Sequence, residues 1–298
     1  MPITDTYIEK DAKINEEIDR LRHASTQALL TRKDVIIVAS VSCIYGLGNP
    51  KEYQEENMKI SVGDKIDRNK FLHKLINIHF TRTTADILPS TFRAIGNVVE
   101  IMPSSEKFTY SIHLSGGTDQ YIEKISVIDP ISRKIMREED TIFLFPAKHF
   151  LIGKNERERA IKNIEVELAG RLKQLKKEKK ILEADRLKRR TTYDLAMLKE
   201  VGYTSGIENY SRHLSGRKVG EAPDTLISYF PKTKDGKPDF LTIIDESHVT
   251  VPQIGGMYAG DQSRKKTLVD FGFRLPSVLD NRPLKFNEFE ERVGQIIY

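Results

Sequence analysis

The stretch FLTIIDESHVTVP, residues 240–252, joins a short apolar run to two adjacent carboxylates. Residues 240–244 are apolar or β-branched, and Asp245 and Glu246 follow directly. Such a run predicts a buried strand. An acid at the carboxyl end of a strand can hold a Mg²⁺ that bridges nucleotide phosphates, and a second can orient or deprotonate an attacking water. The alternative is a pair of solvated acids that simply end a strand.

A second apolar run, DVIIVAS at residues 34–40, has the same character. Its four consecutive aliphatic residues show no alternation, which predicts a strand covered on both faces, as in parallel sheets. Two such strands about 200 residues apart favour a single α/β layer, with the material between them inserted. We therefore expect an α/β fold with insertions.

The two regions between these runs differ in pattern. Residues 54–147 hold short strand-like segments punctuated by Gly, Pro, Ser and Asp, which predicts a small antiparallel β-rich domain. Residues 148–224 begin as helix, with an apolar stripe expected to pack against a neighbouring helix, and end in a loop-like region. The stripe consists of Ile161, Ile164, Leu168, Leu172, Leu175, Leu182 and Leu187. After residue 252, GGMYAGDQSRKK is expected to be a loop that enters a short helix.

Composition limits the class of protein. The 298 residues are 39% hydrophobic and 31% charged, with a net charge of +5. No run of about 18 apolar residues occurs, so no membrane span is expected. Cys43 is the only cysteine, which rules out an intrachain disulfide and favours a core residue in a reducing cytoplasm. Residues 171–190 carry ten basic and three acidic residues, either a solvated helix face or a surface for a polyanion.

The residues Asp-Glu-Ser-His at 245–248 resemble motif II of superfamily 2 helicases, whose best-known form is Asp-Glu-Ala-Asp. Together with the flanking residues up to about 286, the segment is similar to the UvrB family of bacterial nucleotide excision repair. The resemblance extends to DTYIEKDAKINEEIDRLRH, DVIIVASVSCIYGLGNP, GIENYSRHLSGR and DTLISYFP. Residues 102–140 are the stretch least like the family.

The resemblance implies part of a RecA-like, helicase-type motor domain with an inserted β-rich domain and a helical subdomain. Residues 1–53 would belong to the motor domain and include the returning strand of a DNA-binding hairpin. Residues 54–147 would bind UvrA, 148–224 would be helical and loop-like, and 225–298 would be motor again. The chain contains no G-x-x-x-x-G-K-[ST] phosphate loop. It therefore resembles a central fragment of the family, without that loop and the second motor domain.

The resemblance also assigns residues. Asp245 and Glu246 would serve ATP hydrolysis, with Asp245 holding Mg²⁺ through ATP. Tyr7 and Lys10 would contact DNA, Tyr7 as part of an aromatic wedge between the strands.

Arg82 and Arg93 would contact UvrA, since an arginine fork suits carboxylates. The family often has a second arginine two residues after Arg93, where this chain has Ile95. Each of these residues has a purely structural alternative, as a packed tyrosine or an exposed basic side chain.

Three functions remain open at this stage. The first is the damage-verification subunit of a UvrABC system, a DNA-dependent ATPase that works with UvrA, UvrC and damaged duplex DNA. The second is a UvrA-binding module without ATPase activity. The third is the UvrB-like module of a transcription-repair coupling factor. The sequence DESH and the long helical segment argue against the third.

Overall fold

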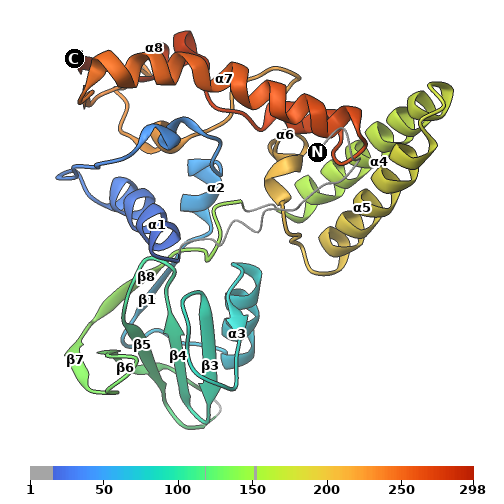
Figure 1. The fold of residues 1–298 in the computed structure, drawn as a ribbon. Coiled ribbons are helices and arrows are strands. Elements are labelled where there is room, and N and C mark those ends of the chain that lie inside the picture. Colours follow the sequence, from blue (N-terminus) through green and yellow to red (C-terminus); the bar gives the residue numbers. More distant parts are fainter. Residues whose placement is uncertain (1–15, 118, 151–152) are drawn as a thin grey trace. The chain divides into compact units, whose positions relative to one another are not determined.

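The computed structural model describes residues 16–117, 119–150 and 153–298 (Figure 1). Their contacts divide the described residues into two compact units. The first unit combines residues 38–49 with 153–298, and the second combines 16–37 with 50–150. We call them the helical unit and the β-rich unit. The tyrosine and lysine assigned to DNA contact, Tyr7 and Lys10, lie outside the described residues.

The β-rich unit is built on a six-stranded sheet in the order β2-β3-β4-β5-β6-β7. These strands span Thr81–Arg82, Thr91–Ile95, Val98–Met102, Thr109–Leu114, Ile122–Ile128 and Ile135–Glu138. All neighbours are antiparallel except β2 and β3. A separate antiparallel ladder joins β1 (Met58–Ser61) to β8 (Thr141–Leu144). The expected antiparallel β-rich region is confirmed.

Alternation along the strands separates two faces of this sheet. Phe92, Val99, Ile101, Ile112 and Ile125 point to one side and are completely buried. Helix α3 (Arg68–Asn77) and the β1–β8 ladder contribute to the same core. Figure 1 shows α3 beside the sheet. The opposite face carries polar and charged side chains in its central row, Arg93, Glu100, Ser111 and Ser126.

Two further helices complete the β-rich unit, α1 (Glu16–Thr31) and α2 (Pro50–Glu55). His23 of α1 stacks on His149, with ring centroids 3.9 Å apart, and its Nδ1 lies 2.8 Å from the Tyr53 hydroxyl. The ring of His149 has its own polar contact, because its Nε2 lies 3.1 Å from Thr26 Oγ1. Burial lowers the pKa of His23 to about 4 and that of His149 well below its usual value. Both rings are therefore neutral at pH 7.

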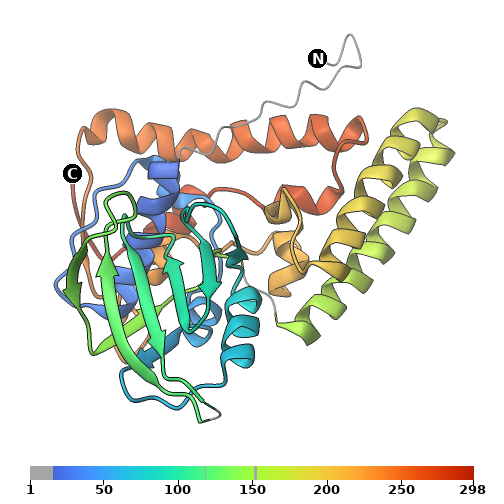
Figure 2. The ribbon, with the colours of Figure 1, turned by 90° about the horizontal axis from the view of Figure 1, so that it is seen from below.

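The helical unit contains an antiparallel hairpin of α4 (Lys154–Lys177) and α5 (Ile181–Glu200), seen side by side in Figure 2. Ile161, Ile164, Leu168 and Leu175 of the apolar stripe are buried. The prediction that this stripe packs against another helix is confirmed for them. Leu182 is an exception at 70% exposure.

The segment expected as a loop and a short helix is instead one continuous helix, α7 (Ser247–Asp270). Gly255, Gly256 and Gly260 lie on its exposed side, where nothing surrounds them. The prediction was wrong because tertiary packing of the opposite side, including Ile254 and Val269, outweighs low helix propensity.

Helix α7 ends against the helical hairpin at a glycine. Gly272 has φ +68°, and a Cβ there would lie 2.3 Å from the Glu183 carbonyl oxygen of α5. The left-handed conformation and the close backbone approach both require glycine.

Short elements connect these helices. They are η2 (Val41–Ile44), η3 (Ile207–Tyr210), α6 (Ser211–Ser215), η4 (Leu226–Tyr229), η5 (Pro276–Asp280) and α8 (Phe286–Arg292). Arg282, only 1% exposed, binds both carboxylate oxygens of Glu288 at 2.6 and 2.8 Å and also donates to the Gly220 carbonyl. This paired charge ties the loop after α6 to α8.

Strand β9 (Leu241–Ile243) pairs in parallel with β10 (Gln295–Ile297). The strand predicted at 240–244 is thus present, but it is only three residues long, and the prediction that it is buried was wrong, since Leu241 and Ile243 are 53% and 67% exposed. Residues 34–40 do not form the expected buried strand: they pair with no described strand, and Ile36 and Val38 are 93% and 96% exposed. An aliphatic run forms a buried strand only where a ladder and a covering layer meet it.

The fold class is mixed α/β, with a β-rich unit and a helical hairpin, as expected. Among the described residues, no helix combines the length and apolar character that crossing a membrane requires. Cys43 is partly buried and unpaired, and burial raises the pKa of its thiol to about 11, so it is not a nucleophile.

Candidate functional sites

The polar face of the β-rich sheet centres on a carboxylate shared by two arginines. Glu100 is directly opposite Arg93 in the β3–β4 register. Arg93 donates to Glu100 Oε2 from Nη2 at 2.6 Å and from Nε at 3.0 Å. Arg133 pairs with the other oxygen, Oε1. The Glu100 side chain is 11% exposed, so this is a largely desolvated ion-pair cluster at the surface.

Arg133 reaches Glu100 from the turn between β6 and β7. Asp129 holds this turn, because its Oδ1 accepts from the backbone N–H groups of Ile131 and Ser132 at 3.1 and 2.7 Å. These bonds lower the pKa of the Asp129 carboxyl. Arg133 itself has φ +60°, a conformation uncommon for a non-glycine residue. The turn therefore orients the Arg133 side chain across the sheet.

The two arginines assigned to partner contact have different environments. Arg93 is 22% exposed, and besides its two hydrogen bonds to Glu100 its Nη1 donates to the Ala85 carbonyl at 3.3 Å. Arg82 is exposed, and its guanidinium has no partner among the described residues. The β2–β3 register pairs Arg82 with Phe92 and not with Arg93. Phe92 belongs to the row of side chains that points to the core side of the sheet. Ile95, in the row of Arg93, is 64% exposed.

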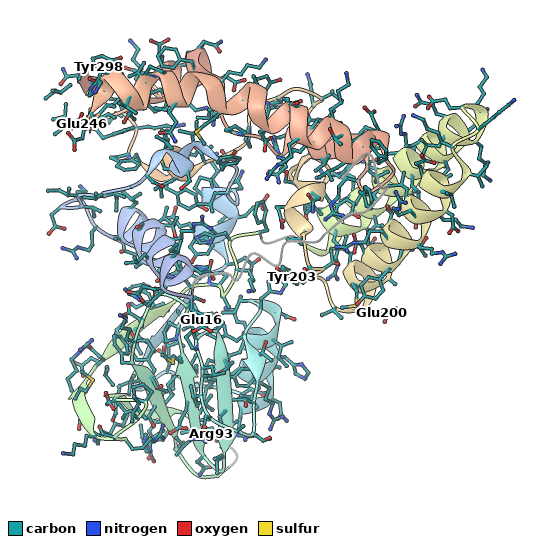
Figure 3. The ribbon with its side chains drawn as sticks, viewed as in Figure 1. Glu16, Arg93, Glu200, Tyr203, Glu246 and Tyr298 are labelled. Atoms are coloured by element: carbon teal, nitrogen blue, oxygen red, sulfur yellow. The ribbon has the colours of Figure 1, made fainter. Side chains whose placement is uncertain are left out.

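The second candidate site follows β9. Ile244 is 7% exposed and donates its backbone N–H to the Ile297 carbonyl, which extends the parallel ladder. Asp245 and Glu246 then leave the sheet at its carboxyl edge, and α7 begins. Figure 3 shows Glu246 and Tyr298 at the same end of the helical unit, as the parallel register requires.

Glu246 has left-handed backbone angles, φ 48° and ψ 47°, and stands as the residue before the first turn of α7. Its carbonyl accepts from the N–H groups of Val249 and Thr250, both at 2.9 Å. Its side chain makes no capping hydrogen bond and is 71% exposed. The tight turn therefore projects the carboxylate into solvent instead of using it for the helix.

The chemistry of this site fits a metal held through a nucleotide. Asp245 Oδ1 accepts from the Glu246 N–H at 3.0 Å, and its other oxygen makes no hydrogen bond to the described residues. Glu246 Oε2 lies 3.4 Å from His248 Nδ1, both side chains being exposed. The described residues contain no group of three or more acids, histidines or cysteines that would hold a metal alone. A Mg²⁺ here would need phosphate and water oxygens as its remaining ligands.

Glu100 and Arg133 were missed by sequence reasoning. Glu100 lies within TFRAIGNVVEI, and its position opposite Arg93 follows from a hairpin turn at Gly96–Asn97. That turn gave a usable signal, since Gly-Asn between alternating runs predicts a hairpin and its register. Arg133 offered no comparable signal, because it comes from another hairpin.

Comparison with known proteins gives a consistent result. Residues 58–150 match the family model described as the UvrB interaction domain, and residues 155–216 match the UvrB third helical domain. The chain is 52% identical to the UvrABC system protein B of Streptomyces coelicolor, 54% to that of Carboxydothermus hydrogenoformans and 53% to that of Lactiplantibacillus plantarum. All of this chain is matched in each case.

The matches cover 41%, 44% and 44% of those three relatives, so the chain spans about two fifths of their length. The two domain matches follow one another along the chain, and the alignment with the relatives, 52% identical overall in the first case, extends beyond both of them over the whole chain. The chain belongs to the UvrB family.

Proposed function

We propose that this chain acts in nucleotide excision repair as the part of a UvrB-type protein that binds UvrA through the polar face of its β-rich sheet. The supporting observation is the Arg93–Glu100–Arg133 cluster, a desolvated charge arrangement on the face opposite the core. The region that carries it matches an interaction domain. The names of the relatives favour a repair subunit over a coupling-factor module. On this proposal the protein works in the cytoplasm with UvrA, UvrC and damaged DNA.

The cluster suits an acidic surface on the partner. Glu100 neutralises part of two guanidinium charges, but each guanidinium carries five donors, more than one carboxylate can accept. Holding Arg93 and Arg133 in fixed positions also removes side-chain entropy before binding, which favours association. Arg82 would add a peripheral contact from the sheet edge. Ile95 would contribute apolar contact where relatives of this family often supply charge.

A second function concerns the carboxylates after β9. Their exposure at the carboxyl end of a parallel ladder supports a role in binding Mg²⁺–ATP and hydrolysing it. Asp245 would hold the metal, which would neutralise charge on the phosphates. Glu246, projected by its left-handed turn, would orient or deprotonate the attacking water. We do not expect turnover by this chain alone, because it contains no phosphate-binding Gly-Lys-Thr loop.

Charge reversal at Arg93 tests the UvrA proposal. Arg93→Glu would place a second carboxylate beside Glu100 and remove the cation offered to the partner. Truncating a buried charged contact at an interface costs about 2–5 kcal/mol, so we expect at least a tenfold loss of UvrA affinity. Calorimetric titration of the full chain with UvrA measures it.

Lys59→Glu is the matched control, because Lys59 is exposed on β1, outside the six-stranded sheet. It should leave UvrA affinity within about twofold. A triple variant, Arg93→Glu with Glu100→Arg and Arg133→Glu, reverses every charge of the cluster, keeps its internal ion pairs and separates folding from recognition. If Arg93→Glu is folded and binds UvrA as tightly as the wild type, Arg93 is not part of the interface.

A further inference from the structure

The basic run at residues 171–190 divides into two kinds of residue. Arg171 and Arg186 are used inside the helical unit, whereas Arg189 is 81% exposed and pairs with Asp185 on the surface of α5. Arg171 donates to the Val269 carbonyl at 3.3 Å, and Arg186 donates to the Phe271 carbonyl at 2.7 Å while its guanidinium lies 4.2 Å from the Phe273 ring centroid. These arginines anchor α7 to the helical hairpin. They are therefore not available to an external ligand.

The lysines of α4 behave differently. Lys162, Lys173, Lys176 and Lys177 are all exposed, and none of them has a hydrogen-bond or ion-pair partner among the described residues. Two other lysines of the hairpin are paired, Lys180 with Glu178 and Lys199 with Glu165. Lys179 and Lys188 are also exposed and without a partner among the described residues, but they lie in the connecting turn and on α5. We call the four lysines on α4 the α4 lysine face.

Helical geometry brings these lysines together. Steps of three and four residues, through Val166 and Ala169, connect Lys162 to Lys173 and then to Lys176 and Lys177. The buried residues of α4, including Ile164 and Leu175, are offset from this row and fix the orientation of the helix. The lysine face therefore points away from the core. The one acidic residue that borders this row, Glu165, is paired with Lys199 of α5 at 2.9 Å.

Helix stability does not account for the whole row. Lysines in a last turn favour the negative end of the helix dipole, and this explains Lys176 and Lys177. The effect fades within one turn, so it does not explain Lys173 or Lys162. From Lys162 to Lys177 the helix rises about 22 Å, at roughly 1.5 Å per residue. The face is a line of positive charge rather than a local cap.

The surroundings of this row favour one kind of partner. The residues between the lysines include Val166, Ala169 and Gly170, and α4 contains no aromatic residue. The face therefore offers neither an aromatic ring for base stacking nor an apolar groove for a peptide helix. Lysine is a compact point charge that suits phosphate. A linear array of such charges matches the regularly spaced phosphates of a nucleic acid backbone.

We infer that the α4 lysine face binds the phosphate backbone of duplex DNA, without reading sequence or lesion. The inference rests on the proposed function only in expecting DNA as a ligand. The contact lies on α4, which is not part of the proposed UvrA interface. Its energy comes from counterion release, so its salt dependence counts the phosphates that it contacts.

The test uses the full chain with Lys162, Lys173, Lys176 and Lys177 all changed to Gln, a residue of similar helix propensity. Fluorescence anisotropy with a labelled undamaged duplex is measured between 50 and 200 mM salt. We expect the variant to bind at least tenfold more weakly at 50 mM. Each lost phosphate contact lowers the slope of log K against log salt by about 0.9, so four lost contacts lower it by about 3.6.

The matched control removes the same charge elsewhere, with Lys232, Lys234, Lys237 and Lys266 changed to Gln, all of them exposed. It should keep most of the affinity and the slope. Equal losses in both variants would assign binding to net charge and overturn the inference, as would an unchanged slope in the α4 variant. Poly-glutamate that competes as well as unlabelled DNA would identify an acidic protein as the ligand instead.

UvrA titration of the same α4 variant distinguishes the two proposals. Unchanged UvrA affinity together with lost DNA binding supports a separate DNA contact. A wild-type chain that binds DNA as described but not UvrA would contradict the proposed function and leave the α4 lysine face standing.

Discussion

The β-rich sheet and the β9–β10 ladder are both made of short apolar strands, yet the apolar side chains of the sheet are far more buried than those of the ladder. Phe92, Val99 and Ile101 of the sheet are 0% exposed. Leu241 and Ile243 of β9 are 53% and 67% exposed. The sheet has six strands, a helix and a second ladder over one face, whereas the β9–β10 ladder has two strands of three residues each.

This difference shows that apolar composition alone does not make a strand buried, and that packing against other elements decides it. An apolar strand gains stability only when a second layer excludes water from it, and a two-stranded ladder alone is marginal. It also separates two kinds of candidate site. The charge cluster of the sheet rests on a rigid core, while the carboxylates after β9 lie at the edge of a small and open ladder.

The largest expected effect comes from deleting a core ring on one side of this comparison. Phe92→Ala should destabilise the β-rich unit by about 3–5 kcal/mol, because it removes the transfer free energy of the ring and leaves a cavity. Ile243→Ala in β9 should change stability by less than about 0.5 kcal/mol. Hydrogen exchange of the β4 and β5 amides, and of the β9 amides, measures the two regions separately.

A similar cost for Ile243→Ala would break the comparison. It would mean that β9 is covered in solution more completely than its exposure indicates, either by association or by a change in packing. Repeating the exchange at two protein concentrations distinguishes these explanations.

An intermediate effect is expected from acid on the two buried histidines of the β-rich unit. His23 has a folded pKa of about 4, lowered by burial from an ordinary value near 6.5, and the pKa of His149 is lowered in the same direction. The unfolded chain therefore binds protons between these values and the folded chain does not. This contribution to stability is complete above about pH 6.5 and is lost progressively as the pH falls from there toward 4.

Exchange of the α1 amides at pH 7.5 and pH 5, corrected for intrinsic rates, checks this expectation. His149→Phe keeps an aromatic ring on His23 but removes one titrating group, so it should reduce the pH dependence. The pH profile would contradict the neutral pair if α1 were equally protected at both pH values, or if the variant had the wild-type profile.

The smallest effect concerns the strained turn after β9. A non-glycine residue in the left-handed region costs about 1 kcal/mol, so Glu246→Gly should stabilise the start of α7 by about 0.5–1 kcal/mol. Glu246→Gln, which keeps the side-chain size and the strain, should have almost no effect. Thermal unfolding by circular dichroism ranks the three proteins. Destabilisation by glycine would show that the Glu246 side chain supports the fold.

Local patterns allowed much of the β-rich unit to be predicted from sequence. Short runs between punctuating glycines and prolines identified the strands, and the apolar stripe identified the helical region, because both patterns record which side of an element is buried. The stripe did not show that this region turns back on itself between α4 and α5. The Asp245–Glu246 pair at the end of a strand was also recognisable, since its chemistry and its position are both written in adjacent residues.

Features that depend on distant partners were not predictable in this way. The aliphatic run at 34–40 looks like a buried strand, but whether it is one depends on strands that pair with it. The length of α7 depends on packing of Ile254 and Val269 that its glycines conceal. The sharing of Glu100 by Arg93 and Arg133, and the stacking of His23 on His149, each join residues from separate elements, and no spacing encodes such contacts.

The glycines within α7 and the glycine that follows its C-terminal end should differ in how readily mutation can replace them. At Gly255, Gly256 and Gly260 an added methyl group would meet nothing, and none has a positive φ. At Gly272 the same methyl group would collide with the backbone of Glu183, which cannot move aside as a side chain can. Mutation can therefore replace the first three one at a time, with little cost and even some gain in helix propensity.

Gly272 has no such route, because every other amino acid carries the same Cβ. A change there would require a simultaneous shift of α5, and single mutations do not supply one. Single substitutions at Gly272 should therefore be eliminated during evolution, although this residue belongs to neither of the candidate functional sites.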